Sequence, residues 1–244
     1  MDLDRKGYTV LREVLPISAC QTMAEQLESV LLQDRPSAID GSTATATSRV
    51  IVGGRNLLSL WKDWRLVAHQ ELVSRFVSKH LGKAAGLVRG LYFDKPPGKG
   101  WALALHRDQT ISVAQHIDPP DPFSKPTRKA GVPHVQASTE LLSQMLTLRL
   151  HLDPMTDDNG PLVVIPGSHL DLESDGQATD QATQTQTIHC AAGDIFVMRP
   201  LLVHGSRAAD PKTDLHRRVI HLEFAPRAEL PGGYQWHNFE PIVS

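Results

Sequence analysis

Four residues suggest a chemistry by their types and their order in the chain: His106, Asp108, His204 and Arg217. Two histidines and one carboxylate that converge on one face of a metal ion leave its other coordination positions open, which is the ligand set of non-haem Fe(II) oxygenases. An arginine further along the chain can hold the dicarboxylate cosubstrate that many of these enzymes use. Because the pattern is short, its surroundings in the sequence have to decide whether it marks a metal site or arises by chance.

The His-x-Asp motif recurs in this sequence. A chain of 244 residues with 12 histidines is expected to contain about one such motif by chance. Four are present: His106/Asp108, His116/Asp118, His151/Asp153 and His169/Asp171. The first ends a predicted strand, where residues two apart project to the same face and can reach one ion. The third also closes a predicted strand, but its aspartate is typical of a turn, and the other two pairs lie in loop-like sequence. The residues alone leave more than one pair open as a metal site.

The two downstream residues also have alternative interpretations. His204 follows the apolar run 195–203, so it is either a hydrogen-bonded core residue, which the sequence by itself favours, or a ligand. Arg217 and Arg218 begin a predicted strand. Alternation puts Arg218 on the apolar face, which is expected to pack against helices, and Arg217 on a mixed face suited to a polar cavity. The alternative is a solvent-exposed pair of arginines.

Hydrophobic periodicity predicts a helical first third followed by short strands. Helices are expected from Ile17 to near Pro36 and over residues 57–81, where Trp61 and Trp64 are interpreted as core residues. The strands predicted after them are 87–93, 101–106, 145–152, 162–165, 187–190, 195–198 and 216–225. Short strands with no helices between them favour an antiparallel sandwich or barrel over a parallel sheet.

Three segments have the composition of loops. Small polar residues predict a mobile loop at 40–48, and the polar segment 171–187 is expected to be a flexible insertion. The proline-rich segment 115–143 is predicted to be a long loop at the mouth of a barrel. Loops of this length are commonly functional.

Composition excludes several classes of protein. The formal net charge of −2 provides no basic field for nucleic acid or an anionic membrane surface. The sequence has no apolar run of membrane-spanning length and no signal-type apolar core near its N-terminus. Cys20 and Cys190 stand far apart without neighbouring cysteines, so we expect reduced thiols in a cytoplasmic protein. His-Arg-Asp also spells a protein-kinase motif, but Val113 stands where that motif requires asparagine.

Several short motifs follow one another along the chain. They are Gly7-Tyr8-Thr9-Val10-Leu11; Phe93-Asp94-Lys95-Pro96-Pro97; Trp101 with His106-Arg107-Asp108-Gln109-Thr110; Asp158-Asn159-Gly160-Pro161-Leu162 with Ile165-Pro166-Gly167-Ser168-His169; and Arg199-Pro200 with His204-Gly205-Ser206 and His216-Arg217-Arg218. In this order they resemble the phytanoyl-CoA dioxygenase-like family, over residues 5–225. The ordered series is far more specific than any one motif.

The resemblance implies a mainly β fold with flanking helices, the double-stranded β-helix (a distorted, cupin-like jelly roll). We expect a single domain over residues 1–244. Its helical N-terminal third, 12–81, is expected to pack on a β-helix core, 87–225. His169 is expected to be structural, as part of a turn.

The resemblance also implies roles for individual residues. It assigns His106, Asp108 and His204 to Fe(II), and it places Arg217 on the distal carboxylate of 2-oxoglutarate with Ser206 as a second contact. Lys95 matches a lysine frequent in the family and is expected to contact the cosubstrate. Arg149 is charged where the family often has an aromatic or polar cavity residue, so it is either a cosubstrate contact or a second anion site for substrate.

The function implied is that of an Fe(II)/2-oxoglutarate-dependent dioxygenase. With O₂ it would hydroxylate a C–H bond of a small molecule and release succinate and CO₂. Two alternatives stay open: a β-helix protein that binds a small molecule or metal without oxidation, and a hydrolase or isomerase that uses zinc or manganese. Loop position suggests three residues that line the substrate pocket, His134, Gln136 and Trp236.

Overall fold

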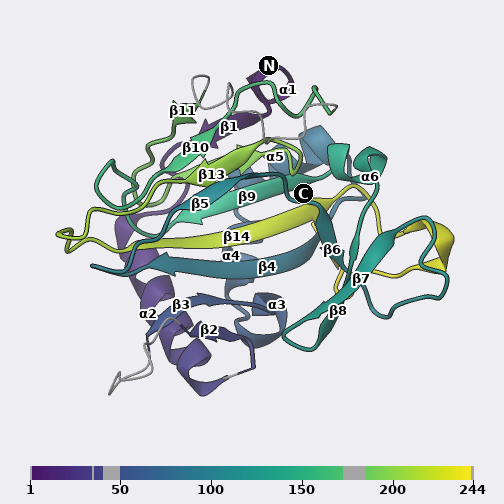
Figure 1. The fold of residues 1–244 in the computed structure, drawn as a ribbon, viewed down its shortest axis with the longest axis horizontal. Coiled ribbons are helices and arrows are strands. Elements are labelled where there is room, and N and C mark those ends of the chain that lie inside the picture. The colour runs from purple at the N-terminus through teal and green to yellow at the C-terminus, as the bar shows by residue number, and fades with distance from the viewer. Residues whose placement is uncertain (1, 35, 41–49, 173–184, 243–244) are drawn as a thin grey trace.

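The computed structural model describes residues 2–34, 36–40, 50–172 and 185–242 of the chain, and its strands form three antiparallel sheets (Figure 1). The largest has the order β1 (Tyr8–Leu11), β12 (Ile195–Met198), β9 (Leu146–His151), β14 (Arg217–Ala225), β4 (Gly86–Lys95), β3 (Ile51–Gly54) and β2 (Ala38–Asp40), with β15 (Glu240–Pro241) also paired to β4. The second has the order β11 (Gln186–Thr187), β10 (Leu162–Val164), β13 (His204–Ser206) and β5 (Leu103–His106). The third has the order β6 (Thr110–Ser112), β8 (Val132–Gln136) and β7 (Ser124–Lys129). The predicted mainly β, antiparallel architecture is confirmed, and the sheets are open rather than closed.

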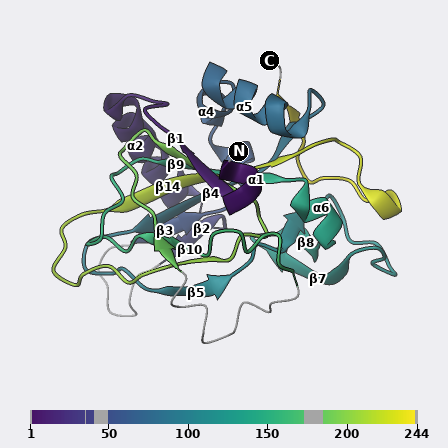
Figure 2. The ribbon, with the colours of Figure 1, turned by 90° about the horizontal axis from the view of Figure 1, so that it is seen from above.

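Helices cover one face of the largest sheet, and the second sheet lies on the opposite side (Figure 2). The helices are α1 (Asp2–Lys6), α2 (Ile17–Gln33), α3 (Leu57–Leu60), α4 (Trp64–Ala68), α5 (Glu71–Leu81), α6 (Thr139–Ser143) and a 3₁₀ turn at Pro231–Gly233. Apolar residues of α2 to α5 pack against Leu148, Leu150, Ile220 and Leu222 on the outer face of β9 and β14. Alternation along a strand turns the neighbouring residues of β9 and β14 inward.

The space between the two larger sheets is apolar on one side. Tyr8 and Phe196 from the first sheet meet Leu162 and Val164 from the second in a buried cluster. Beyond this cluster the inward faces of β9, β14 and β4 carry several charged or polar residues that are nevertheless buried, among them Arg149, Arg217, His221, Glu223 and Lys95. A buried polar interior of this kind needs partners, which makes it the natural place to look for a site.

The helix predicted over 57–81 is broken into three. Trp61 adopts an extended backbone at the end of α3, and Gln70 is again extended before α5, where its side chain accepts a hydrogen bond from the amide of Val73. Both tryptophans are buried in the cluster beneath the largest sheet, as predicted. The chain therefore buries both rings around the breaks between short helices rather than along one continuous helix.

The interpretation of 115–143 as a loop is wrong, because this segment contains β7, β8 and α6. Strands β7 and β8 form a hairpin whose two turn residues, Ala130 and Gly131, both have positive φ. That is the geometry of a tight hairpin turn. Prolines inside both strands hid the pattern, since proline normally argues against a strand. Most of the loop predicted at 40–48 and the core of the insertion predicted at 171–187 lie outside the described residues.

Within the described ranges, no helix is both long and apolar enough to cross a lipid bilayer.

Candidate metal centre

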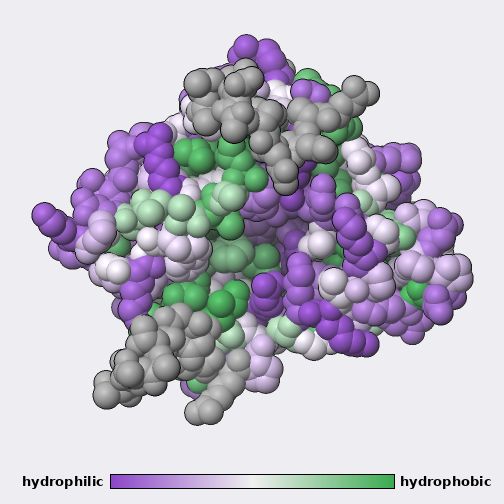
Figure 3. All heavy atoms as spheres, in the orientation of Figure 1, coloured by the Kyte–Doolittle hydropathy of each residue, from purple (hydrophilic) through white to green (hydrophobic). Residues whose placement is uncertain are grey.

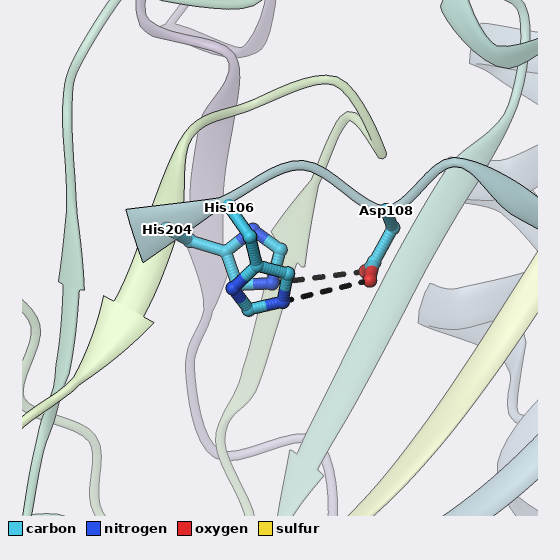
Figure 4. Close-up of side chains that lie close together, drawn as sticks. All are labelled: His106, Asp108 and His204. Carbon is cyan, nitrogen blue, oxygen red and sulfur yellow. Dashed lines mark ion pairs between the residues drawn. The ribbon is translucent and has the colours of Figure 1, made fainter. Parts of the chain in front are cut away.

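Three potential metal ligands converge at one end of the cavity between the larger sheets (Figure 4). His106 ends β5, His204 begins the neighbouring strand β13, and the two residues are direct partners in the ladder. Asp108 lies 3.9 Å from the Nε2 atom of His106 and 3.7 Å from that of His204, measured to its carboxylate oxygens. Donor atoms of all three residues lie within 4.8 Å of one another.

Both imidazole rings are oriented by their backbones. The Nδ1 atom of His106 lies 2.9 Å from the carbonyl of Ala104, and that of His204 lies 2.9 Å from the carbonyl of Leu202. A carbonyl only accepts, so each Nδ1 carries the proton and each Nε2 presents a lone pair toward Asp108. This arrangement fixes the tautomer that a metal ligand requires.

The segment carrying Asp108 is held by the loop that precedes His204. The Asp108 amide donates to the carbonyl of Pro200 at 3.0 Å. Arg107 donates to the carbonyls of Leu201, of Ser168 (2.7 Å) and of Asp171 (2.7 Å). Arg107 is therefore a positioning residue that sequence reasoning missed, although it is the middle residue of the motif.

The strand before His106 departs from strict two-residue alternation. Alternation puts Ala102 and Ala104 beside His106, but both alanines are exposed, and Leu103 lines the cavity together with His106. The reason is a register shift, since His204 pairs with His106 while Ser206 pairs with Leu103. The extra residue on β5 is a bulge, which reverses the faces on either side of it.

The other His-x-Asp pairs have separate partners. Asp153 forms a two-pronged ion pair with Arg218, at 2.8 and 2.6 Å. His116 contacts backbone carbonyls of the third sheet, and His169 contacts the carbonyl of Asp4 at 3.2 Å. In the part of the chain that the structure describes, the cluster around Asp108 is the only group of three such donors.

The three donors open into a cavity of about 230 Å³. Its polar wall comes from β4, β9, β13 and β14, and its apolar wall includes Leu91, Phe93, Trp101, Leu103 and Leu162. Trp101 and Leu103 are also partly exposed to solvent, so they form an apolar rim. On the face seen in Figure 3 the surface is hollowed near its centre, where hydrophilic and hydrophobic atoms meet.

The end of the cavity away from the third sheet is strongly cationic. Arg217 on β14 and Lys95 on β4 are direct partners in the ladder, and both are buried. Lys95 donates to the Ser206 hydroxyl at 2.8 Å and to the Arg207 carbonyl at 2.7 Å. The Nε atom of Arg217 has no hydrogen-bond partner among the described residues. Strand parity thus holds for this pair of arginines: Arg217 faces the cavity, while Arg218 pairs with an aspartate away from it.

Arg149 is the third buried cation of the cavity. It lies on β9, opposite His221 of β14, and it is 8% exposed. Its guanidinium stands 5.9 Å from the ring of Phe93, and among the described residues no hydrogen bond or ion pair engages it.

Burial, followed by repulsion from Arg149, lowers the pKa of Arg217 to about 9. Burial, followed by repulsion from Arg217 and Arg149, lowers the pKa of Lys95 to about 7. Cations crowded in this way favour an anionic ligand.

A buried charge network that sequence reasoning did not identify lies beside Asp108. Arg89 on β4 forms a short ion pair with Glu223 on β14, and Glu223 also lies 3.1 Å from the Nε2 atom of His221. The sequence feature that could have revealed this network is the mixed face predicted for the strand that became β14, because that face contains both His221 and Glu223. Burial raises the pKa of Asp108, but His204, His221, His106 and Arg89 outweigh it and bring the pKa to about 2. The carboxylate is therefore ionised and ready to bind a cation.

The three residues suggested for the substrate pocket do not line this cavity. Trp236 packs in an apolar cluster behind the third sheet and donates to the Arg227 carbonyl at 3.2 Å. Gln136 donates to the side chain of Gln109 at 3.2 Å. His134 lines a smaller neighbouring cavity. The prediction came from position in an apparent loop, and these residues instead belong to the third sheet or to the apolar cluster beneath it.

The fold is that of non-haem oxygenases. AviO1 from Streptomyces viridochromogenes Tue57 aligns at a TM-score of 0.67 with 22% identity, covering 94% of each chain. EctD from S. alaskensis, solved with 2-oxoglutarate and 5-hydroxyectoine, aligns at a TM-score of 0.66 with 19% identity. The alignment covers 100% of this chain and 78% of the EctD chain. SnoK, a non-haem α-ketoglutarate-dependent carbocyclase from nogalamycin biosynthesis, aligns at a TM-score of 0.63 with 17% identity. The alignment covers 93% of this chain and 82% of SnoK. No curated protein matches the sequence significantly.

The chain belongs to the phytanoyl-CoA dioxygenase family, whose model matches residues 3–218. It is thus an Fe(II)/2-oxoglutarate-dependent oxygenase, and the predicted reaction class and cofactors are confirmed.

Proposed function

We propose that the protein hydroxylates a C–H bond of a small molecule, with His106, Asp108 and His204 as the ligands of Fe(II). The observation that carries the proposal is the convergence of two Nε2 lone pairs and one ionised carboxylate on a single point. Two imidazoles and one carboxylate suit Fe(II) and leave coordination positions for a cosubstrate and O₂. The Oδ2 atom of Asp108 is buried and has no hydrogen-bond partner among the described residues, which supports a metal there.

The cationic end of the cavity fits 2-oxoglutarate. Arg217 would hold the distal carboxylate, with Ser206 and Lys95 as further donors, because a guanidinium binds a carboxylate with two parallel bonds. Arg149 lines the same cavity as Arg217 and the three proposed metal ligands. We assign Arg149 to the cosubstrate's other carboxylate.

Bound iron and 2-oxoglutarate supply the oxidation of the C–H bond, with release of succinate and CO₂. The chain's own residues orient the cosubstrate and limit the access of water. Arg107 and the carbonyls of Ala104 and Leu202 hold the ligands in place. Trp101 and Leu103 provide apolar surface at the rim, where an apolar part of the substrate can displace water.

The test is 2-oxoglutarate turnover after anaerobic loading with Fe(II) and exposure to air. The wild-type protein is expected to form succinate, and His106→Ala and Asp108→Ala are expected to form none. Asp118→Ala is the matched control, because it removes an exposed aspartate from another His-x-Asp pair. Full succinate formation by either ligand variant would overturn the assignment.

The same measurement separates the alternatives. A non-catalytic binding protein would bind metal or 2-oxoglutarate without forming succinate. A zinc or manganese hydrolase would not consume 2-oxoglutarate when Fe(II) is added. We also propose a cytoplasmic location, which is supported by the two buried, unpaired cysteines Cys20 and Cys190.

A further inference from the structure

The cavity at the proposed metal centre has two ends of different charge. It follows the inward faces of β4 and β14, where Lys95 pairs with Arg217 at one end and Arg89 pairs with Glu223 at the other. The strand between Arg217 and Glu223 spans about 20 Å, because each residue of an extended chain adds about 3.4 Å. An anionic cosubstrate suits the cationic end at Arg217, so the end at Glu223 is left for the substrate.

The proposed metal ligands lie between these two ends. Ser206 follows the ligand of β13 by two residues and accepts a hydrogen bond from Lys95 at 2.8 Å. Ser112 follows Asp108 by four residues and lines the small neighbouring cavity together with Arg89. The segments that carry the ligands therefore extend from one end of the cavity to the other, and a molecule bound beside Arg89 can present a carbon to the metal.

One carboxylate oxygen of Glu223 holds the polar side chains of the substrate end together. The Oε1 atom forms a short ion pair with Arg89 and lies 3.1 Å from the Nε2 atom of His221. Burial raises the pKa of Glu223, but Arg89 and His221 outweigh it and lower the pKa. The carboxylate is thus ionised, and because it only accepts hydrogen bonds, the Nε2 atom of His221 is the donor.

Two polar atoms at this end have no hydrogen-bond partner in the part of the chain that the structure describes. They are the Nδ1 atom of His221 and the Nε atom of Arg89, and both are buried. With Nε2 as the donor to Glu223, the Nδ1 atom of the neutral ring accepts a hydrogen bond, whereas the Nε atom of Arg89 donates one. Buried polar groups are normally hydrogen-bonded, so a ligand with one donor and one acceptor completes this end. A hydroxyl group is the smallest group that provides both.

The charges at this end cancel one another. Arg89 and Glu223 line the cavity here with opposite signs and form an ion pair. Arg149 lies opposite His221 in the ladder, but a carboxylate of the cosubstrate matches its charge in the proposed function. A further carboxylate would meet Glu223 and a further ammonium would meet Arg89, so either ion would be buried without a partner of its own. The end therefore favours an uncharged polar group.

The surface around these polar atoms is apolar. Leu91 pairs with His221 in the ladder, and the ring of Phe93 meets the ring of His221 edge-on, with their centroids 5.8 Å apart. Trp101 and Leu103 continue the apolar surface to the rim. A substrate with hydrocarbon surface beside a hydroxyl group would bury that surface here and release water.

We propose that His221 and Arg89 bind a hydroxyl group of an uncharged substrate, whose hydrocarbon part lies against the apolar wall. Glu223 is the positioning residue, because it orients His221 and balances the charge of Arg89. The substrate class is thus a neutral alcohol rather than an acid or an amine. The inference rests on the proposed function for the position of the oxidised carbon, but the hydroxyl site itself does not depend on the metal.

The test is calorimetric titration of three probes that share a six-carbon chain: hexan-1-ol, hexanoate and hexylamine. The intact protein is first loaded anaerobically with Fe(II) and 2-oxoglutarate, so that the end near Arg217 is occupied and hexanoate cannot bind there. The wild type is expected to bind hexan-1-ol at least about tenfold more tightly than either ion. His221→Phe should weaken the Kd for hexan-1-ol by about tenfold, the loss of one hydrogen bond. His221→Asn, which retains an acceptor, should recover part of the affinity.

Variants that unbalance the charge separate recognition from a structural role. Glu223→Gln leaves Arg89 without its counter-ion and should bind hexanoate more tightly than the wild type does. Arg89→Gln leaves the carboxylate unpaired and should bind hexylamine more tightly instead. Glu71→Gln is the matched control, because it removes the carboxylate of an exposed ion pair with Arg75 on α5, and it should bind all three probes as the wild type does. Thermal unfolding checks that each variant is folded.

Three results would overturn the proposal. They are a wild type that does not prefer hexan-1-ol, unchanged binding of hexan-1-ol by His221→Phe, and the wild-type order of probes in both charge variants. If the loaded wild type lacks Fe(II)–2-oxoglutarate charge-transfer absorption, the proposed function fails. Titration of hexan-1-ol into the metal-free wild type and into metal-free His221→Phe then still decides on the hydroxyl site.

Discussion

The amide of Asp108 donates a hydrogen bond to the carbonyl of Pro200 at 3.0 Å, so the segment with two of the proposed ligands is tied to the loop that leads to the third. Arg107 strengthens this connection through the carbonyl of Leu201. The relative position of His106 and His204 is thus set by backbone contacts in the protein itself. A preorganised ligand set of this kind loses little entropy when metal binds.

Arg107→Gln should weaken metal binding without removing a ligand. The variant loses charged donors to the carbonyls of Ser168, Leu201 and Asp171, and loss of such outer contacts typically costs roughly 10- to 100-fold in metal affinity. Anaerobic titration with Fe(II) measures the change, and Arg107→Lys should recover part of it. Wild-type affinity in the glutamine variant would show that the loop holds its shape without this side chain.

Gly205→Ala should disturb the same centre from the other strand. A Cβ atom at this position would lie 2.6 Å from the carbonyl oxygen of Leu103, where the β5 bulge brings the two backbones together. We expect a loss of stability of about 1–3 kcal/mol, typical of overpacking, and weaker Fe(II) binding. Thermal unfolding and metal titration measure both effects. Ala104→Ser, at an exposed position on the paired strand, should change neither.

Arg217→Gln should raise the KM for 2-oxoglutarate by roughly 10- to 100-fold, because a two-pronged, charge-assisted contact is lost in a buried site. The neighbouring variant Arg218→Gln removes a guanidinium that pairs with Asp153 instead. It should lower the thermal stability and leave the KM unchanged. Initial rates of succinate formation at varied 2-oxoglutarate provide the comparison, and the reverse pattern would exchange the roles of the two arginines.

The affinity for 2-oxoglutarate should fall as the pH rises above 7. Burial and the adjacent arginines lower the pKa of Lys95 from 10.5 to about 7, so above this pH the lysine is largely neutral in the free protein. A bound carboxylate favours the protonated form, hence binding takes up a proton and weakens by up to about tenfold per pH unit between about pH 7 and 8. Calorimetry in buffers of different ionisation enthalpy measures the uptake. Lys95→Met should bind more weakly at pH 6.5 and lose this pH dependence, and an unchanged profile would exclude Lys95 as its source.

The sequence by itself determined what depends on local periodicity. Alternation along residues 217–225 separated Arg217 from Arg218, because a two-residue repeat assigns each side chain to one face of a strand. The order of short motifs was sufficient to predict the family, and with it the cosubstrate and the general architecture. These features can be predicted without knowing which strands lie side by side.

Only the tertiary structure decided how distant segments meet. It brought His204 beside His106 through the pairing of β13 with β5, and the bulge in that pairing turned Leu103 rather than Ala104 into the cavity. It also made a sheet from a proline-rich segment and brought the Lys129 ammonium to the Thr110 hydroxyl. Register, bulges and contacts between remote segments depend on the packing of the whole chain, and no local pattern in the sequence records them.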